Sequence, residues 1–176
     1  LYVVTTADAK ETRLTTGGDA NRFNGRLDWV YQEEVYGRGT FKGYWWAPDS
    51  KRLAYLSLDE TKVPTFTLVD DRTQPQKLLQ ARYPKVGDPN PVATLGVVDL
   101  DGHTTWIRDP YPGQETLIVQ VGWDPKGRLL AAWQPDHITA TTSVITSITA
   151  PGGDPVDRYH STGTVVIQAG WKALEP

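Results

Sequence analysis

Short strand-like runs, separated by clusters of turn-forming residues, fill nearly all of this 176-residue chain. Runs rich in β-branched and aromatic residues, bounded by Gly, Pro, Asn, Asp or Ser, predict β-strands. We expect a hairpin over residues 1–16, and further strands at Phe41–Ala47, Leu53–Leu58, Phe66–Val69, Ala93–Leu100, Thr104–Ile107, Leu117–Trp123, Leu129–Trp133, Ser143–Ile148 and Thr164–Gln168. Strands this short and this regularly interrupted indicate an all-β sandwich, barrel or propeller.

The amino-acid composition argues against several classes of fold and function. Sixteen glycines and thirteen prolines exclude a coiled coil, and no apolar run approaches the ~18 residues of a membrane-spanning helix. The net charge is -3 and the basic residues are scattered, which argues against nucleic-acid binding. The absence of cysteine excludes disulfides and thiol catalysis. His103, His137 and His160 each stand alone without metal-ligand spacing, so we expect surface histidines and no metal or cofactor.

A short internal sequence repeat favours a propeller over a sandwich. The stretch from Trp46 to Ala54 recurs from Trp123 to Ala131, each time as Trp-x-Pro, a turn, a basic residue and an apolar strand. The copies lie 77 residues apart, further than the ~40–50 of a plain blade, so an inserted arm is expected.

The expected fold is therefore a β-propeller fragment of about two blades plus part of a third, with one short helix. Residues 1–16 would end one blade, 17–41 would be an insertion, 42–109 a blade with an arm at 59–91, and 115–171 the next blade. A propeller needs about four to eight blades to close, so we expect a piece of a larger protein.

Only residues 28–36 have helical character. Asp28 suits an N-cap and Gly37 suits the position after the helix ends. Glu33 and Glu34 are adjacent on this helix, where they could form a solvated face or converge on one small cation. Two carboxylates this close are expected to raise each other's pKa.

No serine of the chain has the Gly-x-Ser-x-Gly frame of a hydrolase nucleophile; the five serines are Ser50, Ser57, Ser143, Ser147 and Ser161. We expect no catalytic triad within these residues and no peptidase activity of the chain alone.

An ordered set of motifs runs through the chain: Asp28-Trp29-Val30-Tyr31-Gln32-Glu33-Glu34, Tyr44-Trp45-Trp46-Ala47-Pro48-Asp49, Leu53-Ala54-Tyr55, Val63-Pro64-Thr65, Arg82-Tyr83-Pro84-Lys85-Val86-Gly87 and Asn90-Pro91. This set resembles the dipeptidyl peptidase IV family of prolyl oligopeptidase-type serine peptidases, with residues 28–34 similar to the family's double-glutamate motif. The likeness is nearly continuous from residue 17 to about residue 102. Residues 103–176 match only in outline. The lack of cysteine and the Gly37-Arg38-Gly39 turn resemble the bacterial branch.

The resemblance implies a function. Members of the family release dipeptides with Pro or Ala second from peptide N-termini, and their two glutamates hold the free α-amine; by position these are Glu33 and Glu34. The catalytic Ser, Asp and His belong to an α/β-hydrolase domain, and a substrate-binding arginine to an earlier blade, both outside this chain. The resemblance also implies homodimerisation through the arm at 59–91 and a periplasmic, extracellular or membrane-anchored location outside the cytoplasm.

Two other functions stay open at this stage. A propeller that lacks catalysis could be a protein-interaction module, as some relatives of the family are. A carbohydrate-binding β-domain would use exposed tryptophans, whereas strand patterns place Trp45, Trp46, Trp123 and Trp133 in the core.

Overall fold

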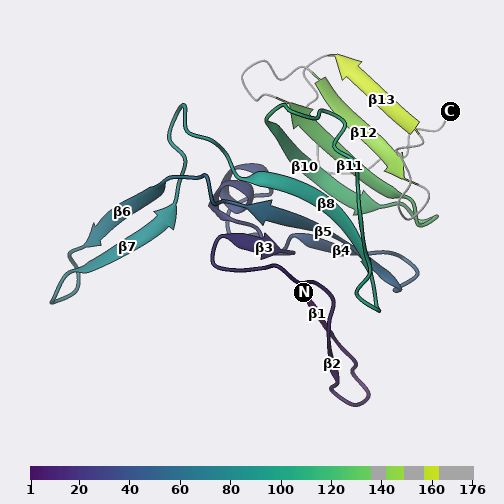
Figure 1. Cartoon of the computed structure of the whole chain (residues 1–176), viewed down its shortest axis with the longest axis horizontal. Helices are drawn as coiled ribbons and strands as arrows, with labels where there is room; N and C mark the ends of the chain where they lie inside the picture. Colours follow the sequence, from purple (N-terminus) through teal and green to yellow (C-terminus); the bar gives the residue numbers. More distant parts are fainter. Residues whose placement is uncertain (136–141, 149–156, 163–176) are drawn as a thin grey trace.

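The computed structural model describes residues 1–135, 142–148 and 157–162. Almost all of the regular structure is antiparallel sheet (Figure 1). The expected strand Thr164–Gln168 and His137 lie outside the described residues. Among the described residues, no helix is both long enough and apolar enough to cross a membrane. The elements are β1 (Tyr2–Val4), β2 (Glu11–Arg13), β3 (Arg22–Asn24), η1 (Tyr31–Val35), β4 (Tyr44–Trp46), β5 (Arg52–Asp59), β6 (Thr65–Asp70), β7 (Lys77–Arg82), β8 (Val92–Asp99), β9 (Thr104–Trp106), β10 (Thr116–Trp123), β11 (Leu129–Pro135), β12 (Thr142–Ile148) and β13 (Asp157–Thr162).

The central sheet is built on β5 and β8, which pair along their whole lengths from Arg52↔Asp99 to Asp59↔Val92. β9 extends the sheet beyond β8. The other edge of β5 is shared by two short strands, because β4 pairs with its first half and β3 with its second half. The chain between β3 and β4 therefore leaves the sheet at the middle of this edge and returns there.

The two points where the chain leaves and re-enters the sheet are joined by hydrogen bonds around Leu56. The Gly25 N–H donates to the Leu56 carbonyl at 2.8 Å, and the Leu56 N–H donates to the Gly43 carbonyl at 2.9 Å. Gly43 in turn donates to the Gly25 carbonyl at 3.0 Å. A Cβ on Gly43 would lie 2.8 Å from Leu27 Cδ2, and Gly25 has a φ of +74°, so both positions favour glycine.

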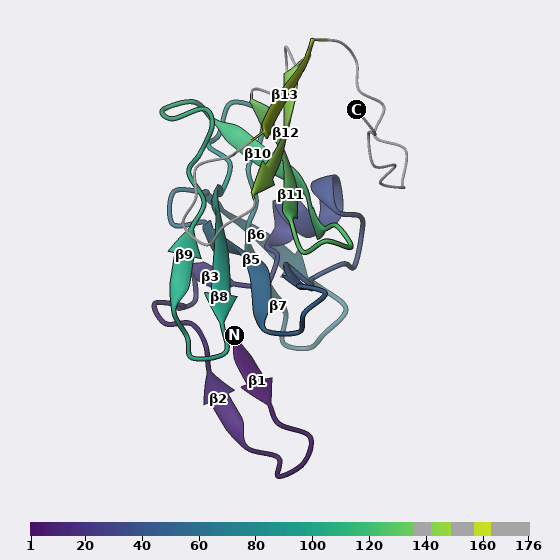
Figure 2. The ribbon, with the colours of Figure 1, turned by 90° about the vertical axis from the view of Figure 1, so that its right-hand side faces the viewer.

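A second sheet, in the order β10-β11-β12-β13, lies beside the central one (Figures 1 and 2). Both sheets contribute to one buried apolar cluster, which includes Leu56, Leu95, Ile118, Val121 and Trp133. Two antiparallel sheets that share a core in this way are arranged as neighbouring propeller blades would be.

β6 and β7 form a two-stranded sheet of their own, which projects from the rest of the molecule in Figure 1. They pair from Thr65↔Arg82 to Asp70↔Lys77. This hairpin lies within the arm predicted at 59–91. We refer to β6, β7 and their turn as the arm. The boundaries of the blades stay predictions.

The expected short helix is present but is wound as a π-helix. The Tyr36 N–H donates to the Tyr31 carbonyl at 2.8 Å, five residues back. Asp28 caps the turn that leads into it, because its Oδ1 accepts the Tyr31 N–H at 3.0 Å. Gly37, with a φ of +101°, follows the C-cap residue Tyr36, which agrees with its predicted place after the helix.

Two tyrosines of the helix hold it against β10. The Tyr31 hydroxyl accepts the Ile118 N–H at 3.1 Å, and the Tyr36 hydroxyl donates to the Ile118 carbonyl at 3.2 Å. The register of β10 against β11 shifts directly after Ile118. The helix therefore provides hydrogen-bond partners for the backbone of β10 at the point where the pairing of β10 with β11 is irregular.

The prediction that four tryptophans lie in the core is wrong for one of them. Trp133 is buried, and Trp45 and Trp123 pack partly buried against the core, but Trp46 is 43% exposed. Successive residues of a strand point to opposite faces, so Trp46 cannot share the core face that Trp45 occupies.

Replacing Tyr31 with Phe should destabilise the protein by about 1–3 kcal/mol, because the buried Ile118 N–H loses its acceptor. Urea unfolding measures the change, and Tyr2→Phe, at an exposed hydroxyl, is the control. Equal stability of the two variants would show that the Tyr31 hydrogen bond contributes nothing.

Candidate functional site

Glu33 is held in place by its neighbours. Its Oε1 forms an ion pair with the Arg38 guanidinium, and its Oε2 accepts the Gln32 side-chain N–H at 3.2 Å. The side chain is only 16% exposed. The expectation that the two glutamates raise each other's pKa is wrong for Glu33, since its hydrogen bond with Arg38 lowers the pKa of this carboxyl. Glu33 is therefore a fixed, ionised carboxylate.

Gln32 holds the turn that places Arg38 beside Glu33. Its buried side-chain oxygen accepts the Gly39 N–H at 2.7 Å, which folds the turn after the helix back along it. Gly37 and Gly39 both have positive φ, a backbone conformation that suits glycine. Sequence reasoning treated Gly37-Arg38-Gly39 as a turn alone and missed the ion pair. The separation of only five residues between Glu33 and Arg38 is the sequence feature that could have indicated this ion pair.

Glu34 is exposed and has no hydrogen-bond partner for its carboxylate among the described residues. It lines a cavity of about 890 Å³ between the helix and the segment that follows the arm, together with Trp29, Val30, Tyr83, Pro84, Lys85, Val86, Gly87, Asp88, Asn90, Gln114 and Glu115. The structure thus places one glutamate of the pair in a fixed ion pair and the other at an open cavity. Convergence of both carboxylates on one cation stays a prediction.

The base of the arm packs directly on the start of the helix. The rings of Trp29 and Tyr83 lie 4.3 Å apart between centroids, and Tyr83 also contacts Phe66 of β6 at 5.8 Å. The Tyr83 N–H donates to the Pro64 carbonyl at 3.0 Å, which continues the pairing of β6 with β7. The position of the arm is therefore coupled to that of the helix that carries the glutamates.

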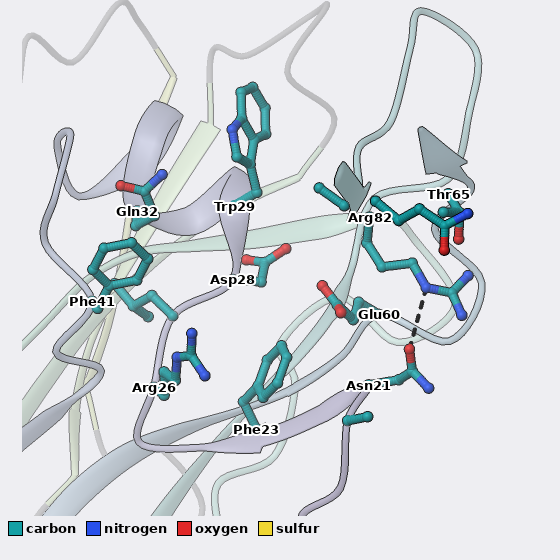
Figure 3. Close-up of a pocket in the computed structure, with 14 residues that line it drawn as sticks. Asn21, Phe23, Arg26, Asp28, Trp29, Gln32, Phe41, Glu60, Thr65 and Arg82 are labelled. Atoms are coloured by element: carbon teal, nitrogen blue, oxygen red, sulfur yellow. Dashed lines mark hydrogen bonds between the residues drawn. The ribbon is translucent and has the colours of Figure 1, made fainter. Parts of the chain in front are cut away.

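A second cavity, of about 450 Å³, is lined by residues of β3, the start of the helix and the arm, among them Phe23, Trp29 and Arg82 (Figure 3). Its charged lining residues are Arg26, Asp28, Glu60 and Arg82. Burial raises the pKa of Asp28, and burial together with the Asp28 charge raises the pKa of Glu60 to about 7. Sequence reasoning did not find Glu60, which belongs to no motif with a recognised chemistry.

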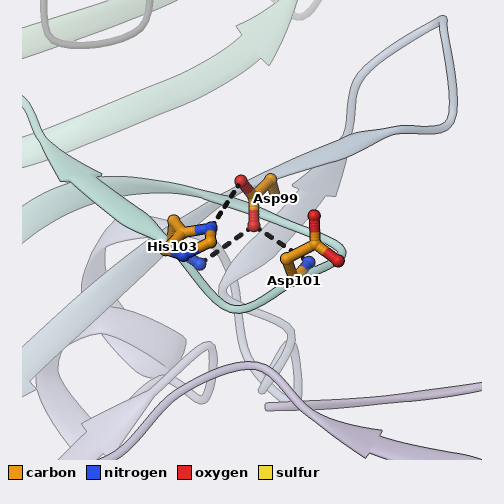
Figure 4. A group of neighbouring side chains, drawn as sticks. All are labelled: Asp99, Asp101 and His103. Carbon is orange, nitrogen blue, oxygen red and sulfur yellow. Dashed lines mark hydrogen bonds and ion pairs between the residues drawn. The ribbon is translucent and has the colours of Figure 1, made fainter.

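The structure brings Asp99, Asp101 and His103 together in the turn between β8 and β9 (Figure 4). Asp99 Oδ1 accepts the backbone N–H groups of Asp101 and His103, both at 2.9 Å, and Oδ2 lies 3.2 Å from His103 Nδ1. These hydrogen bonds, led by the one from the His103 backbone, lower the pKa of Asp99. The carboxylate of Asp99 thereby stabilises an exposed hairpin turn.

The comparisons with known proteins agree with one another. Residues 1–146 match the model of the dipeptidyl peptidase IV N-terminal region. The "probable dipeptidyl-aminopeptidase B" of Penicillium rubens is 32% identical over 145 residues, which cover 74% of this chain and 16% of that protein. The dipeptidyl peptidase 4 of Arthroderma otae is 32% identical over 157 residues, which cover 84% of this chain and 20% of that protein.

A solved structure shows the fold. The crystal structure of Porphyromonas gingivalis dipeptidyl peptidase 4 superposes with a TM-score of 0.73 at 23% identity, over 85% of this chain and 21% of that one. This confirms the predicted all-β propeller fragment. The chain spans about a fifth of the length of the relatives that it matches.

Replacing Arg38 with Gln should raise the pKa of Glu33 toward its ordinary value, since the guanidinium holds it down. The stabilisation from this pair is present above the unfolded-state pKa of Glu33 and is lost as the pH falls through the lower folded-state pKa. A carbon NMR titration of the Glu33 carboxyl measures the shift. Lys42→Gln is the control, because Lys42 lies over the Tyr44 ring instead; the same Glu33 titration in both variants would contradict the assignment.

Proposed function

The chain belongs to the dipeptidyl peptidase IV family, as part of its N-terminal region, and from that premise we propose that it is the substrate-gating and amine-recognising propeller portion of a serine exopeptidase. This peptidase releases X-Pro and X-Ala dipeptides from peptide N-termini. One observation carries the proposal: Glu33 and Glu34 share a short helix on which Glu33 is fixed and Glu34 is open to a cavity.

The charges of the site suit a protonated amine. Glu33, Glu34 and Arg38 together carry a net charge of about -1, which one ammonium group neutralises. An ammonium has three N–H donors, and the open Glu34 carboxylate offers unoccupied acceptor oxygens to them. Such charge-assisted hydrogen bonds contribute about 1.5–3 kcal/mol each.

A carboxylate pair at a fixed distance from the nucleophile would determine how many residues are released from the N-terminus. Two extended residues span at most about 7 Å, so an amine anchored at Glu33 and Glu34 would place the second peptide bond at the nucleophile. A longer N-terminal extension would meet the helix. We propose that the nucleophilic Ser and its Asp and His belong to a hydrolase domain outside this chain, and that the protein works outside the cytoplasm, in the periplasm, in the medium or anchored to a membrane.

We further propose that the arm pairs with the arm region of a second copy. Leu68 pairs with Leu79 and Val69 pairs with Leu78, and all four side chains are exposed. Because successive residues of a strand face opposite ways, both faces of this hairpin carry apolar groups. An isolated two-stranded hairpin is at best marginally stable in water, so a covering partner would stabilise it.

Replacing Glu33 or Glu34 with Gln in the full-length peptidase should lower kcat/KM for a Gly-Pro amide at least about tenfold, or about 1.4 kcal/mol, because each variant removes one charge that holds the ammonium. Wild-type activity should also fall as the pH rises past about 8, where the substrate amine loses its proton. Glu11→Gln, at an exposed site on β2, is the control. If both variants cleave free and N-acetylated substrates as the wild type does, the two glutamates are a solvated helix face.

Replacing Leu68 and Leu79 with Asp should convert a dimer into a monomer, since two charges per chain would then have to be buried at the arm. Light scattering coupled to size-exclusion chromatography measures the mass in solution. Thr6→Asp, at an exposed position in the turn between β1 and β2 and outside the arm, is the control. A wild-type protein that is a monomer, or a variant that stays a dimer, would exclude the arm as the interface.

A further inference from the structure

Two carboxyl groups from distant parts of the chain meet in the cavity of about 450 Å³ at the base of the arm. Asp28 lies at the entry to the helix, and Glu60 follows the end of β5. Figure 3 shows the Glu60 side chain extending toward Asp28. Both side chains are buried, with 5% of Asp28 and 7% of Glu60 exposed. Buried acids are rare unless something satisfies them, so the pair calls for an explanation.

One carboxylate oxygen of Asp28 lacks a hydrogen-bond donor in the described part of the chain. Its Oδ1 accepts the Tyr31 N–H, but its Oδ2 is buried and has no hydrogen-bond partner among the described residues. A buried acceptor without a donor costs roughly 1–3 kcal/mol. A donor within the cavity that faces Oδ2 would remove this cost.

The basic residues of the cavity are engaged elsewhere. Arg82 donates from Nε to Asn21 Oδ1 at 3.2 Å and from Nη1 to the Val63 carbonyl at 2.7 Å. The Arg26 guanidinium lies over the rings of Phe23, at 5.4 Å, and Phe41, at 5.9 Å. Within the part of the chain that the structure describes, neither arginine forms an ion pair with Asp28 or Glu60.

The remaining groups around the pair do not titrate near neutral pH. Gln32 of the helix and Thr65 and Gln80 of the arm are uncharged. Burial raises the pKa of Tyr31, whose hydroxyl therefore stays protonated. Glu60 is the group that can change, because a protonated carboxyl has an O–H to donate.

We propose that Asp28 and Glu60 share one proton across this cavity, with the Glu60 O–H donating to Asp28 Oδ2, and that this carboxyl pair positions the Glu33–Glu34 helix on the base of the arm. The positioning role rests on the proposed function, whereas the shared proton does not. The proton supplies the missing donor and leaves a single negative charge on the pair. Its loss places two carboxylates face to face, where they repel.

The consequence for pH follows from the raised pKa of Glu60, about 7 in the folded chain against 4.5 ordinarily. Burial and the Asp28 charge raise this pKa, and Arg82 and Arg26 oppose them. A raised folded-state pKa gives stabilisation that is fully present below about 4.5 and is lost as the pH rises through about 7. The contact between the helix and the arm should therefore weaken between weakly acidic and weakly alkaline pH.

The direct test is a carbon NMR titration of the full-length protein labelled at glutamate side-chain carboxyls, with the Glu60 signal identified by its loss in Glu60→Gln. The wild-type midpoint is expected near 7. Asp28→Asn should lower it by at least one pH unit, because the variant removes the repelling charge and adds an amide donor. Asp71→Asn, at an exposed site in the turn of the arm, should leave it unchanged. A wild-type midpoint near 4.5, or an unchanged midpoint in Asp28→Asn, would overturn the shared proton whether or not the protein is a peptidase.

The positioning role has its own test. Glu60→Gln keeps a permanent N–H donor, so the ratio of KM in the wild type to KM in Glu60→Gln for a free-amine substrate should rise severalfold between pH 6 and pH 8. The titration of the substrate amine cancels in this ratio. A ratio that stays constant with pH, alongside a Glu60 midpoint near 7, would leave the shared proton in place and overturn its effect on the helix.

Discussion

The hydrogen bonds that surround Leu56 fix where the segment that carries Glu33, Glu34 and Arg38 leaves the central sheet and returns to it. At this residue the edge of β5 passes from its pairing with β4 to its pairing with β3. The segment between these strands must leave and re-enter the sheet at one point, and Gly25 and Gly43 make this possible by approaching each other within hydrogen-bond distance. The helix, the glutamates and the Arg38 turn all belong to this excursion. A side chain on Gly43 would meet Leu27 and force the two crossings apart.

The excursion is held at its far end by the next sheet. Tyr31 and Tyr36 bond the N–H and the carbonyl of Ile118, so a helix of less than two turns need not be stable by itself. The π winding agrees with this arrangement, because it lets hydroxyls five residues apart reach one backbone position on β10. Short helices gain their stability from packing, and here the packing is a pair of specific hydrogen bonds.

Sequence reasoning could predict features that depend on local chemistry. Apolar runs between turn residues located β4, β5, β8 and β9 of the central sheet but not β3, which lies within the predicted insertion at 17–41. Asp28 and Gly37 marked the ends of the helix. It could not predict features that depend on how the chain folds back on itself. The lowered pKa of Glu33 depends on how the following turn is wound through Gln32, although these residues are close in the sequence. The raised pKa of Glu60 and the hydrogen bonds of Tyr31 and Tyr36 with Ile118 depend on groups that are far apart in the sequence.

The helix carries three acidic residues within seven positions, and the fold treats each one differently. Asp28 caps the helix and faces Glu60 in a buried cavity, so its charge is limited by desolvation and by a neighbouring acid. Glu33 is ionised, and its negative charge is compensated by the ion pair with Arg38. Glu34 alone has an open carboxylate beside a cavity. Asp28 is buried away from solvent and Glu33 is paired with Arg38, so the open carboxylate of Glu34 is the acidic group of the helix that remains accessible to a cation, next to a fixed carboxylate. The proposed recognition of a single amine rests on this difference between the three acids.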